Sequence, residues 1–420
     1  MTRMVVGLVA AALAAVLATV PASAQNRVKI GVLNDQSGPY SDTSGPGSVV
    51  AAQIAVDEFR ATHPGLQIEL VSADHQNKPD VGTGIARQWY DEGGVDAIVD
   101  IQNSAVALAV QHLAAQVGKV SIVTGAVTPE LSGKGCSPTG VFWAMDAYSL
   151  AAGPVQALAD KKKWFFITVD LAGGLLFERE GEKAVNAAGG TVIGRVRHPL
   201  GSPDMSAYLL QAQSAGAEVI ALANAGADLI NSIKGANEFG LLARGTAMAP
   251  LLIGANEFGL LARGTAMAPL LMFDTDVKAV GFPLAQGMVI GTGFYWDLND
   301  RTRAFAKLFA DRFKRMPTQY QASVYAATRH YLKAVDAAGT TEGAAVLAKF
   351  RELPIDYMSE HPGHTRPDGR VTYDVYVMQV KTSAESKGEW DLMRRLRTIP
   401  AESAFRPLSE SECPLINKAG

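Results

Sequence analysis

Residues 28–42 read VKIGVLNDQSGPYSD, a β-rich apolar run that breaks into a turn-rich loop. Residues 49–60 follow with Ala, Val, Ile and Phe at helical spacing. Strand-like and helix-like segments then continue to alternate, at 67–73, 79–93, 95–99, 105–116 and 120–124. Strands that alternate with helices indicate βαβ units, so this part of the chain predicts a parallel sheet.

The pattern restarts after a junction at residues 146–150. Helix-like and strand-like segments alternate again, at 151–160, 164–169, 176–188, 191–197, 205–215 and 219–223. A second α/β sheet is the simplest account of this repetition. The chain has 420 residues, which exceeds the size at which single hydrophobic cores stop growing, so we expect two domains.

The pattern changes beyond residue 290. Long amphipathic segments predict three helices, at 301–315, 322–338 and 341–353. Residues 371–381 alternate as one long strand or as an antiparallel pair. The tail from Thr382 is polar and interrupted by prolines, so we expect it to be loosely ordered unless another contact pins it.

One stretch occurs twice. The eighteen residues GANEFGLLARGTAMAPLL fill positions 235–252 and again 254–271, with Ile253 between the copies. A solenoid needs at least three stacked units, so this is a single duplication or a sequence-assembly error. Because only one set can occupy the native positions, we expect a helix running on from Asp228 to use the first copy. The strand expected at 269–273 should use the second copy, and the remainder should form an extra surface segment.

The first residues indicate export. Arg3 precedes an apolar run at 5–20, and Pro21 leads into the small residues Ala22-Ser23-Ala24. This order predicts a signal peptide at 1–24. A membrane anchor is the alternative, but the apolar run is shorter than the ~20 residues that span a bilayer. Loss of Arg3 would take the net charge from -3 to -4, which offers no basic field for nucleic acid.

The chain has two cysteines, Cys136 and Cys413, and each lies beside a proline in a loop-like stretch. In an exported protein such a pair is interpreted first as a disulfide, with two buried free thiols as the alternative. A Cys136–Cys413 bond would pin the C-terminal tail.

Catalytic signatures are missing from the sequence. It contains no G-x-S-x-G, H-E-x-x-H or P-loop motif, and no G-x-G-x-x-G after the first strand. His361 and His364 are separated by Pro362 and Gly363, which excludes adjacent helical ligand positions and argues against a metal site. We therefore expect no enzyme, no cofactor and no metal.

Candidate binding residues lie in the loops that end the predicted parallel strands, where open α/β sheets bind ligands. In chain order these residues are Ser37, Tyr40, Asn103, Ser104, Ala126, Val127, Asn224 and Asp228. Ser104 starts a predicted helix, so it could hold a carboxylate at the helix N-terminus or simply cap the helix. The residues alone leave both possibilities open.

Four stretches carry a family resemblance: VKIGVLNDQSGPYSD at 28–42, TGAVTPELSGKG at 124–135, GFYWDLND at 293–300 and CPL at 413–415. Together they resemble the leucine/isoleucine/valine-binding family of periplasmic receptors, and the last two resemble a branch associated with aromatic acids. The resemblance covers nearly all of the chain after the signal peptide.

The resemblance implies the type I periplasmic binding fold, with two Rossmann-like lobes joined by a three-segment hinge and closing on a ligand. The first lobe would comprise 27–147 and 294–353, and the second 148–293 and 354–381. A C-terminal tail would follow at 382–420.

The resemblance also implies roles for individual residues. Ser104 falls at the position that binds the ligand carboxylate, and Ala126 at a backbone contact. Val127 replaces a threonine that helps to hold a ligand ammonium, which argues against an α-amino acid. Asp228 falls at the acidic ammonium partner, which argues for one.

The remaining positions concern the shape of the cleft. Leu171 and Gly173 replace larger aromatic residues, which would leave the second-lobe wall apolar and roomier. Tyr295 and Trp296 would cover an aromatic ring or pack in the hinge. Tyr40 would face the cleft or cover the first helix.

These observations predict a periplasmic substrate-binding protein of an ABC importer. Its ligand would be a small carboxylate, either an aromatic or other hydrophobic acid or a branched-chain-type amino acid. Its partner would be an inner-membrane permease, and the protein would be a monomer. A ligand sensor of the same fold and, less favoured, an exported α/β enzyme are the alternatives.

Overall fold

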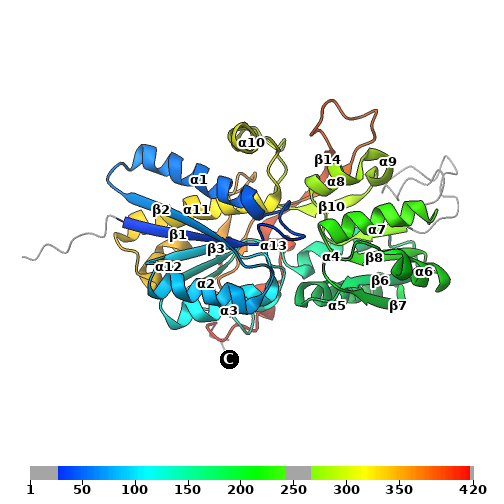
Figure 1. Ribbon diagram of the computed structural model, residues 1–420, viewed down its shortest axis with the longest axis horizontal. Helices are drawn as coiled ribbons and strands as arrows, with labels where there is room; N and C mark the ends of the chain where they lie inside the picture. Colours follow the sequence, from blue (N-terminus) through cyan, green and yellow to red (C-terminus); the bar gives the residue numbers. More distant parts are fainter. Residues whose placement is uncertain (1–26, 242–265, 417–420) are drawn as a thin grey trace, which may run out of the picture.

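The computed structural model describes residues 27–241 and 266–416. Two α/β lobes lie side by side, the first coloured mainly blue and cyan and the second green in Figure 1. The predicted α/β class with two sheets is confirmed. The residue bounds assigned to the lobes from the sequence stay a prediction.

The first lobe is built on a parallel sheet of order β2-β1-β3-β4-β5. The strands are β1 (Arg27–Asn34), β2 (Gln67–Asp74), β3 (Ala97–Asp100), β4 (Val120–Val123) and β5 (Gly140–Phe142). The helices that follow strands β1 to β3 are α1 (Gly45–Thr62), α2 (Pro79–Asp91) and α3 (Ser104–Gln116). Strand β1 is buried on both faces, because Val28, Ile30 and Val32 join the large core while Leu33 packs with the residues of α2 and α3.

The second lobe repeats this plan with the parallel order β7-β6-β8-β9. Its strands are β6 (Lys163–Val169), β7 (Thr191–His198), β8 (Val219–Ala223) and β9 (Ala266–Pro269). Its helices are α4 (Ala147–Ala157), α5 (Ala172–Ala187), α6 (Ser206–Ser214), α7 (Ala227–Glu238), α8 (Asp274–Val280) and the short α9 (Phe282–Ala285).

The duplicated stretch contributes to this lobe as expected at both ends. Helix α7 enters the first copy, and β9 lies in the second copy. The strand bounds predicted at 269–273 were wrong, because pairing with β8 begins at Ala266 and ends at Pro269, where proline removes the amide donor. The extra surface segment expected between the copies lies outside the described residues.

The C-terminal part returns to both lobes. Helices α10 (Asp300–Phe313), α11 (Gln319–Ala338) and α12 (Gly343–Glu352) complete the first lobe, where α11 packs against α1 (Figure 1). Strands β10 (Val289–Thr292), β13 (Val375–Val380) and β14 (Met393–Ile399) form an antiparallel sheet. A small β11–β12 pair (His364–Thr365 and Val371–Thr372) and α13 (Ala401–Ala404) complete the chain.

Residues 371–381 therefore form neither one strand nor a hairpin, since β12 and β13 pair with different partners. The tail is also more ordered than expected. Strand β14 reads MRRLRTI, and its three arginines hide the strand pattern because they lie on the exposed edge of the sheet.

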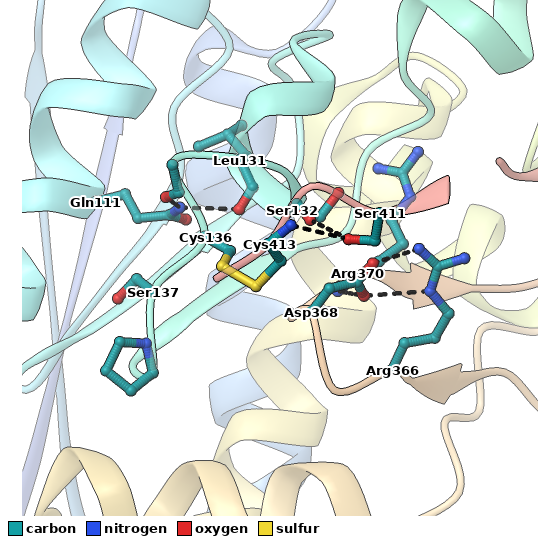
Figure 2. The surroundings of a disulfide bond; sticks show 12 residues. Gln111, Leu131, Ser132, Cys136, Ser137, Arg366, Asp368, Arg370, Ser411 and Cys413 are labelled. Atoms are coloured by element: carbon teal, nitrogen blue, oxygen red, sulfur yellow. Dashed lines mark hydrogen bonds and ion pairs between the residues drawn. A yellow bond between two sulfur atoms is a disulfide. The ribbon is translucent and has the colours of Figure 1, made fainter. Parts of the chain in front are cut away.

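The predicted disulfide is confirmed and joins this tail to the first lobe. Cys136 and Cys413 are bonded, with Cα atoms 5.6 Å apart and a sequence separation of 277 residues. Figure 2 shows the bond beside Ser411, whose hydroxyl donates to the carbonyl of Ser132 at 3.2 Å. The last described residues are thus fixed to the loop after β4.

Candidate functional site

A cavity of about 180 Å³ lies between the two lobes. The first lobe lines it with Tyr40, Thr43, Asn77, Pro79, Gln102, Asn103, Ser104, Ala105, Gly125, Val127 and Tyr320. The second lobe lines it with Val169, Leu171, Ala172, Gly173, Gly174, Phe177, Ala223, Asn224, Ala225, Leu271 and Phe273. Within the described part of the chain, this lining includes no Asp, Glu, Lys or Arg.

Tyr40 is placed by the loop after β1. The carboxylate of Asp35 accepts the N–H groups of Gly38 at 2.7 Å and Tyr40 at 3.1 Å, and the amide of Asn77 at 2.7 Å. A Cβ on Gly38 would lie 2.6 Å from that carboxylate, so only glycine fits this turn. Burial, together with the charges of Asp228 and Asp35, raises the pKa of the Tyr40 hydroxyl, which therefore stays protonated.

Ser104 stands at the N-terminus of α3 with free hydrogen-bonding groups. The side chain of Asn103 caps the helix by accepting the N–H groups of Ala105 at 3.0 Å and Val106 at 3.2 Å. The N–H and the hydroxyl of Ser104 find no hydrogen-bond partner among the described residues. The capping role that the sequence left open thus belongs to Asn103, and Ser104 remains available to a ligand.

A second helix N-terminus reaches the cavity from the other lobe. Helix α5 begins after Leu171, which supplies no side-chain cap, so the first N–H groups, from Ala172 on, lack a cap. A Cβ on Gly173 would lie 3.3 Å from Val127 and 3.5 Å from the hydroxyl of Ser104. The two lobes therefore approach closely at the ligand position, and a larger residue at 173 would occupy part of the cavity.

Further contacts across the cleft lie beside Tyr40. Gly226 has φ of 58°, and a Cβ there would meet the carbonyl of Pro39 at 2.5 Å. A Cβ on Gly201 would lie 3.6 Å from the same proline. Loops of the second lobe thus pack directly on the loop that carries Tyr40, as expected for a closed arrangement of the lobes.

Asn224 directly follows β8 and lines the same cavity. Its amide nitrogen lies 3.1 Å from Nε2 of His198 and 3.1 Å from the hydroxyl of Ser232. Its amide oxygen is buried and has no hydrogen-bond partner in the described structure.

Six of the predicted binding residues line the cavity: Tyr40, Asn103, Ser104, Val127, Leu171 and Asn224. Gly173, which the resemblance also pointed to, lines it as well. Two of the remaining predicted residues are not part of the cavity lining, because other contacts hold them within the first lobe. The hydroxyl of Ser37 donates to Asp74 at 2.6 Å, and Ala126 is fully buried in the core of the first lobe.

Asp228 also lies outside the lining. Its Oδ2 accepts the N–H of Gly201 at 3.0 Å and lies 3.9 Å from His198. Burial raises the pKa of this carboxyl. One oxygen of the group expected to hold a ligand ammonium is therefore engaged within its own lobe, whereas its Oδ1 is buried and has no hydrogen-bond partner among the described residues.

Tyr295 and Trp296 pack against the start of β14 instead of the cavity. The Tyr295 hydroxyl and the Trp296 indole both donate to the carbonyl of Trp390, at 2.9 and 2.7 Å. The Tyr295 hydroxyl also accepts the N–H of Leu392 at 3.0 Å. The sequence left two roles open for Tyr295 and Trp296, covering an aromatic ring or packing in the hinge. These contacts correspond to packing.

The structure adds residues that the sequence did not reveal. Tyr320 opens α11 and meets Phe273 edge to face, with ring centroids 4.7 Å apart. Phe177 and Leu271 extend the apolar wall of the second lobe. These residues come from separate elements, and no spacing rule in the sequence groups them.

Two features of the described residues bear on other functions. Among residues 27–241 and 266–416, His, Cys, Asp and Glu form no group of three or more that could hold a metal ion. Within the same residues, no helix is both long and apolar enough to cross a membrane.

The sequence matches the family model described as periplasmic binding protein at residues 27–257 and 243–389. The chain belongs to the periplasmic binding protein family. The two matches overlap at 243–257, within the duplicated stretch. This family comprises solute-binding proteins of ABC transporters, which are not enzymes.

Solved structures agree with this assignment. A periplasmic binding protein from Burkholderia mallei is 40% identical, with a TM-score of 0.84 over 93% of this chain and 99% of that chain. A branched chain amino acid ABC transporter periplasmic ligand-binding protein from Burkholderia xenovorans is 38% identical, with a TM-score of 0.76 over 92% of this chain and 99% of that one.

Two further matches are more distant. The Leu/Ile/Val-binding protein homolog 8 of Brucella abortus is 29% identical over 54% of this chain, which spans 59% of that relative. A solute binding protein from R. palustris in complex with benzoate is 17% identical and shares the fold, with a TM-score of 0.73 over 90% of this periplasmic binding protein and 98% of that chain. The predicted family and type I fold are confirmed.

Proposed function

We propose that this periplasmic binding protein captures a small carboxylic acid with an apolar, ring-sized body and delivers it to an inner-membrane ABC permease. One observation carries the proposal: two helix N-termini, those of α3 and α5, meet at a cavity that has no charged side chain among its described lining residues. Helix N-termini attract anions through their free N–H groups and the helix dipole.

The neutral lining argues against an α-amino acid. An ammonium group buried in this cavity would lack an acidic partner, and burying an unpaired charge is costly. Val127 offers no hydroxyl, and Asp228 lies outside the cavity lining, where its Oδ2 accepts the N–H of Gly201. A carboxylate needs only donors, and Ser104 and the start of α5 provide them.

The size and walls of the cavity favour an aromatic or other compact hydrophobic acid. An engineered cavity of roughly 150 Å³ binds benzene, so the cavity of about 180 Å³ accommodates one substituted ring. Phe177, Leu271 and Phe273 supply the apolar surface for it. Ser104 would bind the carboxylate, and the second lobe would cover the ring on closure.

The cellular location and the partner protein are inferred from the family assignment. Residues 1–24, which lie outside the described structure, would export the chain to the periplasm as a cleaved signal peptide. The protein would act as a monomer and would present its closed form to the permease. A ligand sensor of the same fold stays the second candidate, although no contact in the structure favours it.

A thermal-shift screen of residues 25–420 tests the proposal. A bound ligand stabilises the fold by about 2.7 kcal/mol at a hundredfold excess over Kd. We expect benzoate-type and compact hydrophobic carboxylates to raise Tm, and their uncharged amides and the branched-chain amino acids to leave it unchanged. Amino acids that raise Tm while the acids do not would refute the assignment.

The duplicated stretch supplies a control for a negative screen. The same panel should be run on a variant that lacks residues 254–272, which removes one nineteen-residue period. No Tm rise with carboxylates in either protein would contradict the proposal, whereas a rise only after deletion would place the defect in the repeat.

A further inference from the structure

The amide of Asn224 can adopt only one orientation. Ser232 donates its hydroxyl proton to the carbonyl of Asp228 at 2.7 Å, so its oxygen can only accept from the Asn224 side chain 3.1 Å away. The atom that faces Ser232 must therefore be the amide nitrogen. Because Nδ1 of His198 lies 2.9 Å from the carbonyl of Pro199 and carries the ring proton, Nε2 accepts the second amide hydrogen of Asn224.

This arrangement uses both hydrogens of the amide and leaves its oxygen over. Asn224 is 3% exposed, and its Oδ1 has no hydrogen-bond partner among the described residues. A buried acceptor without a partner destabilises the site, so native structures rarely keep one without a reason. Since Asn224 lines the cavity and its nitrogen is held by the lobe interior, the oxygen is the polar atom of this side chain left for a ligand.

Tyr320 provides a useful contrast. Its hydroxyl is also buried, lines the same cavity and has no partner in the described structure. A hydroxyl can donate or accept, so it does not say which kind of ligand group would meet it. Gln102 also lines the cavity, and its buried Nε2, which lacks a partner among the described residues, can only donate. Of these three lining residues, Asn224 is therefore the one that offers an acceptor of fixed direction.

We propose that Asn224 determines specificity by accepting a hydrogen bond from a hydroxyl group on the ligand, so that the ligand class is a hydroxylated carboxylic acid. This inference rests on the proposed function, which places the carboxylate at Ser104 in the opposite lobe. We assign the donor to a hydroxyl group, because an ammonium would find no acidic side chain among the described lining residues.

A ligand of this kind would join the two lobes by polar contacts at both ends. The carboxylate would bind the first lobe, and the hydroxyl group would satisfy the second lobe only when the cleft closes. Such a contact stabilises the closed state selectively, which is what a ligand must do to shift the lobes toward closure.

Titration calorimetry on residues 25–420 tests the inference with three sets of probes: benzoate, its ortho, meta and para hydroxy derivatives, and the corresponding methoxy derivatives. A methoxy group keeps the oxygen but cannot donate. We expect one hydroxy isomer to bind at least about tenfold more tightly than benzoate and than its methoxy counterpart, since a site built to receive a hydroxyl disfavours ligands that lack it.

Variants locate the effect. Asn224→Leu should bring the hydroxy isomer and benzoate to about equal affinity, whereas Asn231→Leu, the same change in α7 outside the cavity lining, should preserve the preference. If Asn224→Leu does not fold, the wild-type ratio of hydroxy to methoxy affinity still decides.

Each failure has its own signature. Benzoate binding without any gain from a hydroxyl would overturn the role of Asn224 and leave the proposed function standing. Equal gains from hydroxy and methoxy groups would also overturn it. A methoxy group has no proton to donate to Oδ1 of Asn224, so its gain would have to come from another contact. If no carboxylate binds, the proposed function fails and this inference fails with it.

Discussion

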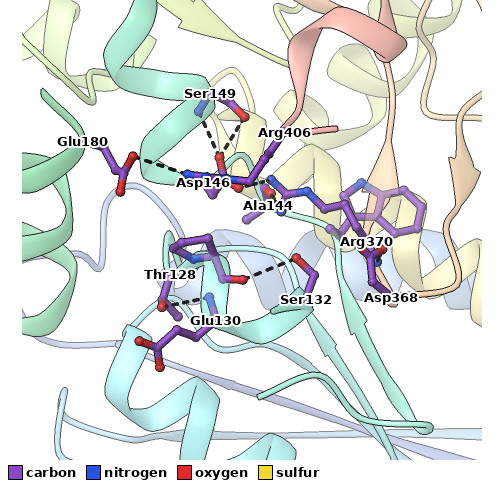
Figure 3. Close-up of polar contacts among 12 residues, drawn as sticks. Thr128, Glu130, Ser132, Ala144, Asp146, Ser149, Glu180, Asp368, Arg370 and Arg406 are labelled. Carbon is purple, nitrogen blue, oxygen red and sulfur yellow. Dashed lines mark hydrogen bonds and ion pairs between the residues drawn. The ribbon is translucent and has the colours of Figure 1, made fainter. Parts of the chain in front are cut away.

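Replacement of Arg370 by methionine should destabilise the protein by about 3 kcal/mol. The guanidinium is almost fully buried, donates from Nη1 to the carbonyl of Ala144 at 2.7 Å, and pairs through Nη2 with Asp146 at 2.8 Å (Figure 3). It also lies over the rings of Phe142 at 4.1 Å and Phe405 at 4.6 Å.

The magnitude follows from what the substitution leaves behind. Methionine retains apolar packing against the two rings, but the carboxylate of Asp146 would remain buried without its cation. Loss of one partner of a buried ion pair costs roughly 3–5 kcal/mol for that reason. Asp146 keeps the N–H and hydroxyl of Ser149, at 2.9 and 2.8 Å, so we expect the lower end of the range.

The position of the pair links it to the hinge. Asp146 caps α4 where the chain first passes into the second lobe, and Arg370 lies on the last passage between α12 and β13. Phe405 belongs to the C-terminal segment that the disulfide fixes. The pair therefore connects three segments that are far apart in the sequence.

A double-mutant cycle with Asp146→Asn measures directly the cost of leaving the Asp146 carboxylate without its cation. The asparagine keeps an oxygen for the α4 cap and carries no charge, so Arg370→Met should cost only ~1 kcal/mol in that background. The assay is urea unfolding at pH 7, followed by circular dichroism. Equal costs of Arg370→Met in both backgrounds would refute the stranded-charge reasoning and attribute the loss to packing alone.

Three further predictions concern binding, the tail and pH. Ser104→Ala should weaken carboxylate binding by about 1–3 kcal/mol in calorimetry, and unchanged affinity would remove Ser104 from the site. The double variant Cys136→Ser and Cys413→Ser should lower Tm, with about 5.6 kcal/mol as the chain-entropy limit for a separation of 277 residues; two free thiols in the denatured, unreduced wild type would contradict the bond. Burial raises the pKa of the Asp274 and Asp276 carboxyls to about 7, from an ordinary value of 3.8. The folded state therefore binds these protons more tightly, and the free energy of unfolding should fall as the pH rises from about 4 to 7. The assay is Tm measured across this pH range. Asp274→Asn should reduce the decrease in Tm between about pH 4 and pH 7, and an unchanged pH profile would exclude the Asp274 carboxyl as its source.

The alternation of strands and helices was readable because it is a local property of the chain. Val28, Ile30 and Val32 fall on one face of β1, and apolar residues recur at helical spacing in α1, whatever lies elsewhere. Strand β14 was missed for the opposite reason. Its arginines adopt a strand because the segment pairs with β13. The sequence of residues 393–399 alone does not reveal that pairing.

The candidate binding residues divide in the same way. Tyr40, Ser104 and Asn224 were predictable because each follows a parallel strand, and the ends of parallel strands meet at one edge of a sheet. Asp228 follows β8 just as closely, yet its carboxylate turns to the N–H of Gly201. The direction of that side chain depends on a loop from another element.

The sequence by itself determined the fold class, the family, the disulfide pairing and the strand ends that line the cleft, since periodicity, motifs and cysteine number are written in the order of residues. Folding decided which side chains face the cavity, why none of the described lining residues is charged and which atom of Asn224 lacks a hydrogen-bond partner. Those properties arise from contacts between residues far apart in the chain, such as Gly173 with Ser104 and Arg370 with Asp146, and they exist only once the chain has folded.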